Sequence, residues 1–154
     1  MFANYFNPSF MALIKSISGI RGTIGGKPGE TLSPIDVVRF TAAFGTWLAK
    51  QSDRKKIVIG RDGRISGEMV QRLVVSTLNA LGLDVVDLGL STTPTVEMAV
   101  VTEKAAGGII LTASHNPKEW NALKLLNEKG EFISGEAAAN VLDIAANEVY
   151  VLIP

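Results

Sequence analysis

The sequence predicts an α/β protein with three layers, in which helices cover both faces of a mainly parallel, mixed sheet of about four strands. The first observation is alternation, because short runs of β-branched and aliphatic residues are separated by longer segments with helical spacing of apolar residues. The second is that glycine, proline and hydroxyl residues stand at the boundaries of these segments. The third is that the connections are short, which favours consecutive βαβ units in one sheet.

The first predicted helix begins after Ser33 and runs to about Lys50. Ser33 offers an N-cap, Pro34 occupies the first helical position, and Asp36 adds negative charge to the first turn. The expected buried side of this helix recurs at helical spacing, at Val37, Thr41, Phe44 and Leu48. After a polar break, Ile57–Ile59 is a short β-branched run that predicts a buried strand.

The remaining elements continue this alternation. A second helix is expected to begin at Ser66 as its N-cap and to end at Gly82, which suits the C′ position. A strand at 84–88, a helix at 95–104 and a strand at 109–111 follow. The last two predicted elements are a strand at 123–127 and an alanine-rich helix at 134–148.

The composition is that of a globular chain without disulfides. Hydrophobic residues make up 47% and charged residues 19% of the 154 positions, which is enough apolar material for a core. The absence of cysteine excludes disulfide scaffolds, zinc–thiolate sites, iron–sulfur clusters and thiol nucleophiles. Because 15 basic and 15 acidic residues balance to a net charge of zero, no nucleic-acid partner is expected.

The sequence shows no sign of a membrane span or a secretory signal. No run approaches the roughly 18 apolar residues of a membrane span, and no basic residue precedes the partly apolar residues 1–10. We therefore expect a cytoplasmic protein without a membrane partner. Residues 1–11 are interpreted as an N-terminal extension, 12–148 as one domain, and 149–154 as the start of a linker.

Three polar segments are expected to meet at one edge of the sheet. Gly60–Arg64, Gly89–Pro94 and Thr112–Pro117 each follow a predicted strand. Ligands of such sheets bind at the carboxyl ends of the strands. Because these segments are rich in glycine, hydroxyl and cationic residues, the zero net charge conceals a locally positive edge.

Ser114 is the most informative residue at that edge. Its neighbour His115 suggests a serine hydrolase, but adjacent side chains diverge on an extended turn, and the sequence has neither a Gly-x-Ser-x-Gly elbow nor a second histidine. A simpler alternative is that Ser114 and His115 only satisfy backbone groups of a turn. To react, a serine at this position needs a base or a partner group already activated for transfer.

Cationic side chains around that edge favour phosphate as the ligand. Arg61 and Arg64 follow one strand, and Lys118 and Lys124 lie close to another. Upstream, residues 18–23 are interpreted as a glycine-bracketed arginine loop whose backbone can approach an anion closely. Because a spreading negative charge requires several donors, this joint placement predicts phosphoryl chemistry. Neither common nucleotide-binding glycine motif is present.

The motifs also carry a family resemblance. Residues Thr112–Pro117 read Thr-Ala-Ser-His-Asn-Pro, and with the preceding apolar strand they resemble the phosphoserine loop of the α-D-phosphohexomutases. This superfamily includes phosphoglucomutase, phosphomannomutase and phosphoglucosamine mutase. The resemblance covers roughly residues 12–148 and departs at Ala122, where the family commonly has glycine. Supporting matches, in the order of that family's first domain, are Ser18–Gly22, Gly60–Arg64, Thr93-Pro94 and Asn121–Lys124.

The resemblance implies that Ser114 is phosphorylated and gives its phosphoryl group to a hexose phosphate. The hexose bisphosphate would then reorient and return its other phosphate to Ser114, so that phosphate moves between C1 and C6. His115 and Lys124 would lie beside the transferring group. Arg21 and Lys124 are the candidates for assisting proton transfer at the sugar hydroxyl.

The resemblance also implies a metal and further phosphate contacts. The phosphate on Ser114 would be one ligand of Mg²⁺, with the remaining ligands in a second domain. Asn116 and Lys118 would shape the loop. Arg61 and Arg64 would hold the loops together or line the phosphate site. The candidate contacts to phosphate or substrate are Ser18, Arg61, Arg64, Asn116 and Lys118.

Family members have four domains, and their magnesium, sugar-recognition and distal phosphate loops lie in the second, third and fourth. The sequence contains no Asp-x-Asp-x-Asp segment, so we interpret it as a first domain that is inactive alone.

Its expected partners are a hexose phosphate or bisphosphate and the further domains of the same chain. The alternative is a non-enzymatic domain of the same fold that binds a phosphosugar or a protein. Glucose, mannose and glucosamine all stay open as the hexose.

Overall fold

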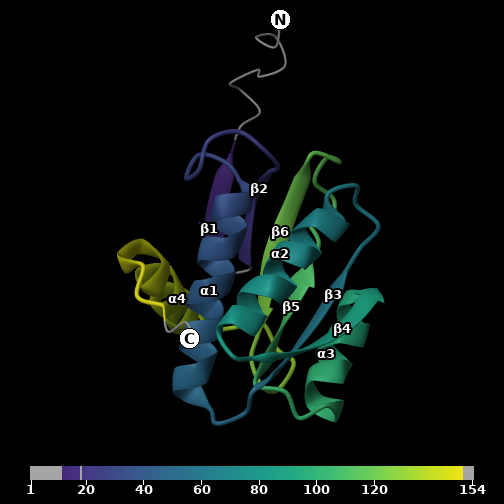
Figure 1. Cartoon of the computed structure of the whole chain (residues 1–154). Helices are drawn as coiled ribbons and strands as arrows, with labels where there is room; N and C mark the ends of the chain where they lie inside the picture. Colours follow the sequence, from purple (N-terminus) through teal and green to yellow (C-terminus); the bar gives the residue numbers. More distant parts are fainter. Residues whose placement is uncertain (1–11, 18, 151–154) are drawn as a thin grey trace, which may run out of the picture.

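The computed structural model of the chain describes residues 12–17 and 19–150 (Figure 1). The strands are β1 (Leu13–Ser16), β2 (Gly19–Thr23), β3 (Lys56–Arg61), β4 (Asp84–Leu90), β5 (Gly107–Leu111) and β6 (Trp120–Leu126). The helices are α1 (Pro34–Gln51), α2 (Gly67–Ala80), α3 (Thr93–Thr102) and α4 (Gly135–Asn147). No helix among these residues is long and apolar enough to cross a membrane.

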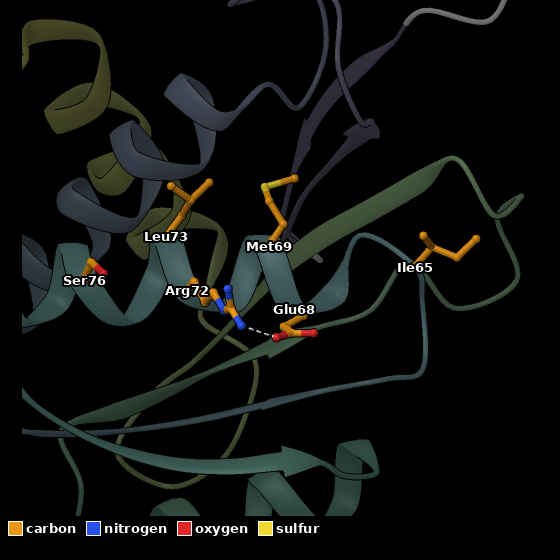
Figure 2. A pocket seen from close by; sticks show the side chains of 6 residues that line it. All are labelled: Ile65, Glu68, Met69, Arg72, Leu73 and Ser76. Carbon is orange, nitrogen blue, oxygen red and sulfur yellow. Dashed lines mark hydrogen bonds and ion pairs between the residues drawn. The ribbon is translucent and has the colours of Figure 1, made fainter.

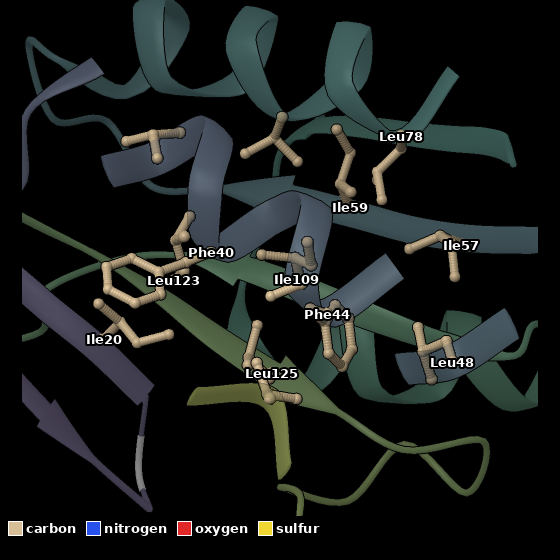
Figure 3. Close-up of a cluster of buried hydrophobic side chains, with 14 of the residues drawn as sticks. Ile20, Phe40, Phe44, Leu48, Ile57, Ile59, Leu78, Ile109, Leu123 and Leu125 are labelled. Atoms are coloured by element: carbon tan, nitrogen blue, oxygen red, sulfur yellow. The ribbon is translucent and has the colours of Figure 1, made fainter. Parts of the chain in front are cut away.

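Helices cover both faces of one sheet with the strand order β1-β2-β6-β5-β3-β4. Successive residues of a strand point to opposite faces, and β3 divides its side chains in this way. Ile57 and Ile59 belong to the large core cluster with α1, α2 and α4 (Figure 3), whereas Val58 belongs to a smaller cluster with α3. The predicted three-layer α/β class is therefore confirmed.

The sheet differs from the prediction in the number of strands and in the balance of pairings. The sequence predicts about four, mainly parallel strands, but the described residues form six, and only the pairs of β3 with β4 and with β5 are parallel. β6 runs antiparallel to β5 because residues 112–119 join them without a helix. A parallel crossover needs about a dozen residues or more, so this short connection excludes one.

The segment interpreted as an arginine loop is a strand instead. β2 pairs with β1 on one side and with β6 on the other, so residues 19–23 lie within the sheet. Its glycines serve close packing of backbones, because a Cβ on Gly19 would lie 2.4 Å from the carbonyl oxygen of Leu123. A Cβ on Gly22 would lie 2.5 Å from the carbonyl oxygen of Ala12.

The predicted helices are present, with two informative differences at their ends. α1 has the expected cap at Ser33, and Gly82 follows α2 with a φ of +70°, as the C′ position requires. α3 begins at Thr93, two residues before the predicted start, because Thr92 is its N-cap. Ser66 precedes α2 but does not cap it with its side chain, which instead accepts a hydrogen bond from Nδ2 of Asn121 at 2.9 Å.

A buried carboxylate holds the loop between β2 and α1. Asp36 is fully buried, and its oxygens accept hydrogen bonds from the N–H groups of Gly29 at 3.0 Å and Ser33 at 3.3 Å. The same loop donates the N–H of Ile24 to the carbonyl oxygen of Glu119 at 2.8 Å. Asp36 therefore connects α1 to the edge of the sheet where the polar segments were expected to meet.

Replacing Asp36 tests this connection. Asp36→Ala is expected to lower the free energy of unfolding by about 2–3 kcal/mol, because it breaks the capping box with Ser33 and leaves the buried N–H of Ser33 and the N–H of Gly29 without their acceptor. Urea unfolding measures the change, with the exposed Asp53→Ala as the matched control. Equal stabilities of the two variants would show that the buried carboxylate does not hold the loop.

Candidate functional site

Ser114 is exposed in the loop between β5 and β6. Its φ of +53° places it in the left-handed region, which residues other than glycine seldom adopt. Its N–H donates a hydrogen bond to Oγ1 of Thr112 at 3.1 Å. Because the left-handed conformation costs about 1–2 kcal/mol, other contacts of the loop must hold it in place.

Arg64 supplies those contacts from the turn after β3. Its guanidinium has five N–H groups, and all five have acceptors. Nε donates to the carboxylate of Asp62 at 3.2 Å. The other four donate at 2.7–2.9 Å to backbone carbonyl oxygens of the loop and its end, those of Ser114, Asn116, Pro117 and Trp120. Arg64 thus fixes the backbone from Ser114 to the start of β6.

Lys124 of β6 contacts the side chain of Ser114. Its Nζ donates a hydrogen bond to Ser114 Oγ at 2.8 Å. Both residues line a hollow of about 210 Å³ at this edge of the sheet. The described residues that line it are Gly19, Arg21, Thr112, Ala113, Ser114, His115, Asn116, Ala122 and Lys124.

Arg21 brings a second cation into the hollow from β2. It lies opposite Ala122 of β6 in the antiparallel register, so the two side chains share one face of the sheet. The Nε atom of Arg21 is buried and has no hydrogen-bond partner among the described residues. A buried, charged donor without an acceptor is costly, so this atom is suited to an oxygen of a bound anion.

Comparison with known proteins decides which family these motifs belong to. A family model described as phosphoglucomutase/phosphomannomutase, alpha/beta/alpha domain I, matches residues 13–151. The chain belongs to the phosphoglucomutase/phosphomannomutase family and contains its domain I.

Individual relatives agree with this assignment. A phosphoglucomutase/phosphomannomutase from Thermococcus kodakarensis is 38% identical over 130 residues, which are 82% of this chain and 28% of that protein. A phosphoglucosamine mutase from Helicobacter pylori is 37% identical over 131 residues, which are 84% of this chain and 29% of that protein. The solved structure of a phosphoglucomutase/phosphomannomutase family protein from Burkholderia thailandensis has a TM-score of 0.76 at 27% identity, covering 93% of this chain and 31% of that one. The chain thus spans less than a third of the length of these relatives.

Domain I brings some of the predicted site residues together and leaves others apart. His115 and Asn116 line the hollow with Ser114, Lys124 and Arg21. Lys118 is exposed and does not line it, and Ser18 lies outside the described residues. Arg64 does not line the hollow, and all of its N–H groups donate to Asp62 or to backbone carbonyl oxygens.

Arg61 takes part in a polar network that the sequence analysis did not predict. Its Nε donates to Oε1 of Gln71 at 2.6 Å, and Nε2 of Gln71 donates to Oδ1 of Asp87 at 2.5 Å. Gly89–Pro94 reaches the same network, because the N–H of Ser91 donates to the carbonyl oxygen of Arg61 at 2.9 Å. This segment therefore packs beside Arg61. Of the three segments expected to meet, Thr112–Pro117 contributes to the lining of the hollow, whereas Gly60–Arg64 and Gly89–Pro94 do not. The signal in the sequence that could have revealed this network is Asp87, a charged residue between apolar residues of β4.

A larger hollow of about 490 Å³ lies on α2 and differs in character (Figure 2). Glu68 and Arg72 form an ion pair one helical turn apart across it, and both side chains are well exposed. An exposed pair of this kind contributes little to binding or stability. The larger volume of the hollow on α2 therefore does not make this hollow the candidate functional site. The lining residues are Ile65, Glu68, Met69, Arg72, Leu73 and Ser76.

Replacing Arg64 tests how the domain I loop is held. Arg64→Lys keeps the positive charge but cannot serve four carbonyl oxygens, so we expect a loss of about 2–4 kcal/mol in stability. Amide hydrogen exchange of residues 114–121 should accelerate more than that of β3 and β4. The exposed Arg72→Lys is the matched control. Unchanged exchange in the loop would contradict the role given to Arg64.

Proposed function

We propose that this chain is the phosphoserine-bearing N-terminal domain of a phosphohexomutase, with Ser114 as the phosphoryl carrier. Such an enzyme interconverts a hexose 1-phosphate and a hexose 6-phosphate through a bisphosphate. The observation that carries the proposal is the hydrogen bond of 2.8 Å between Lys124 Nζ and Ser114 Oγ, in a hollow that Arg21 also lines. The family membership supports the same reaction class.

The geometry suits transfer of a phosphoryl group to and from Ser114. In the forward step a sugar hydroxyl oxygen attacks phosphorus, the bond from phosphorus to Ser114 Oγ breaks, and the proton of the sugar hydroxyl passes to Ser114 Oγ, which is left as a hydroxyl. Lys124 donates to the oxygen that departs, and a donor at that place stabilises its developing negative charge. The reverse step, with the other phosphate of the bisphosphate, restores phosphoserine and releases the isomerised hexose phosphate.

Arg21 and His115 complete the surroundings of the transferring group. Phosphoryl transfer depends mainly on positioning and on donors around the equatorial phosphate oxygens. Arg21 lines the hollow and its buried Nε lacks an acceptor, which such an oxygen could supply, and His115 is an exposed residue of the same lining. Arg21 and Lys124 remain the candidates for assisting proton transfer at the sugar hydroxyl.

A magnesium ion fits this site through phosphate. The described residues contain no cluster of three or more His, Cys, Asp or Glu that could hold a metal ion. The phosphate on Ser114 would supply the hard oxygen ligand that Mg²⁺ prefers, and the bound ion would neutralise charge on the transferring oxygens. We place its remaining ligands, and the groups that recognise the hexose, in further domains of the full-length protein. On this account the chain alone does not turn over a hexose phosphate.

Mass analysis of the full-length protein tests the carrier role. After incubation with a hexose 1,6-bisphosphate and Mg²⁺, the wild-type protein is expected to gain the mass of one phosphoryl group, located at Ser114. Ser114→Ala should gain none, because the accepting oxygen is removed. Ser76→Ala on α2, an exposed serine outside the Ser114 hollow, should be phosphorylated normally. A wild-type protein that takes up no phosphate would refute the proposed function and favour a binding domain without catalysis.

A further inference from the structure

One exposed aromatic side chain lies beside Lys124, the residue that donates to the proposed phosphoryl carrier. Phe132 is 43% exposed, although a phenyl ring is normally buried. Its ring centroid lies 5.9 Å from Nζ of Lys124, within the range of a cation–π interaction. The same Nζ donates to Ser114 Oγ at 2.8 Å. The ammonium group therefore contacts the ring and the reactive hydroxyl together.

The backbone around Phe132 fixes the side of the sheet on which the ring lies. Phe132 pairs with Leu126 in an antiparallel bridge, and paired residues point to the same face. Leu126 belongs to the cluster with α3, whereas the next residue, Ile133, is buried in the large cluster on the other face. Lys124 lies two residues before Leu126, so its side chain shares the face of the ring.

The turn before Phe132 is held firmly against α3. Oδ1 of Asn127 accepts the N–H of Lys129 at 2.9 Å and the N–H of Glu131 at 3.0 Å. A Cβ on Gly130 would lie 2.3 Å from the carbonyl oxygen of Glu97, so the turn and the helix pack with their backbones in contact. The ring is therefore carried by a fixed segment of backbone.

The positive charge of the hollow explains why an aromatic ring is suited to hold the lysine there. Arg21 and Lys124 both line it, and its described lining residues include no aspartate or glutamate. A carboxylate would hold the lysine but would repel a phosphate. The face of a phenyl ring attracts an ammonium without cancelling its charge, and it limits the freedom of a long, flexible side chain.

We propose that Phe132 is a positioning residue, which holds the Lys124 ammonium against Ser114 during phosphoryl transfer. This inference rests on the proposed function. It assigns the ring to the lysine and not to the sugar, because the ring already faces the ammonium. If the ring contacted the hexose instead, its removal would raise the half-saturating concentration.

The experiment compares Phe132→Leu with Phe132→Tyr in the full-length protein, using a hexose 1,6-bisphosphate and Mg²⁺. The rate of Ser114 phosphorylation, followed by intact mass, gives a maximal rate and a half-saturating concentration. A cation–π contact at an exposed site corresponds to about a two- to five-fold effect on rate. We expect Phe132→Leu to lower the maximal rate by about that factor at an unchanged half-saturating concentration. Phe132→Tyr, which keeps the ring, should retain the wild-type rate.

Controls and alternative outcomes separate this inference from the proposed function. Met98→Leu, at an exposed apolar residue of α3 outside the hollow, is the matched control and should behave as wild type. An unchanged maximal rate in Phe132→Leu would overturn the positioning role and leave the carrier role of Ser114 intact. A raised half-saturating concentration alone would also overturn it, because the ring would then contact the sugar. A wild-type protein without phosphorylation would overturn both.

Discussion

The hydrogen bonds between Arg64 and the 112–119 loop are the interaction on which the rest of the site depends. Four of the five N–H groups of one guanidinium donate to carbonyl oxygens of the loop and of Trp120, the first residue of β6. They fix the loop from Ser114 onward and so maintain the left-handed backbone of Ser114. Arginine is suited to this role because its donors form a rigid planar fork, whereas a lysine offers only a compact point charge.

The elements that follow from local periodicity were predictable from the sequence, and those that depend on distant partners were not. The helix at Ser33-Pro34 has both a cap and an apolar stripe, so its start agrees with the prediction. β2 has no comparable signal in the sequence. Its glycines indicate a turn, unless it is known which backbone atoms lie close to them in space. Gly19 and Gly22 are small since the carbonyl oxygens of Leu123 and Ala12 approach them closely. The antiparallel β6 could have been predicted, because the connection after β5 is too short for a crossover.

The same distinction holds within the candidate site. The sequence predicts that several cationic side chains gather at this edge of the sheet. Their spacing does not show which partner each of them contacts. Arg61 ends β3 and bonds with Gln71, whereas Arg64 lies in the following turn and reaches the loop. Phe132 was missed because only the pairing of its segment with β6 brings the ring beside Lys124.

A high-resolution structure of the Ser114-phosphorylated protein tests the central claim most directly. The account predicts phosphate oxygens within hydrogen-bonding distance of Arg21 Nε and Lys124 Nζ. It also predicts that Arg64 keeps its hydrogen bonds to the four carbonyl oxygens. A phosphate directed into bulk solvent, or an Arg64 side chain that leaves the loop to bind the phosphate, would contradict it.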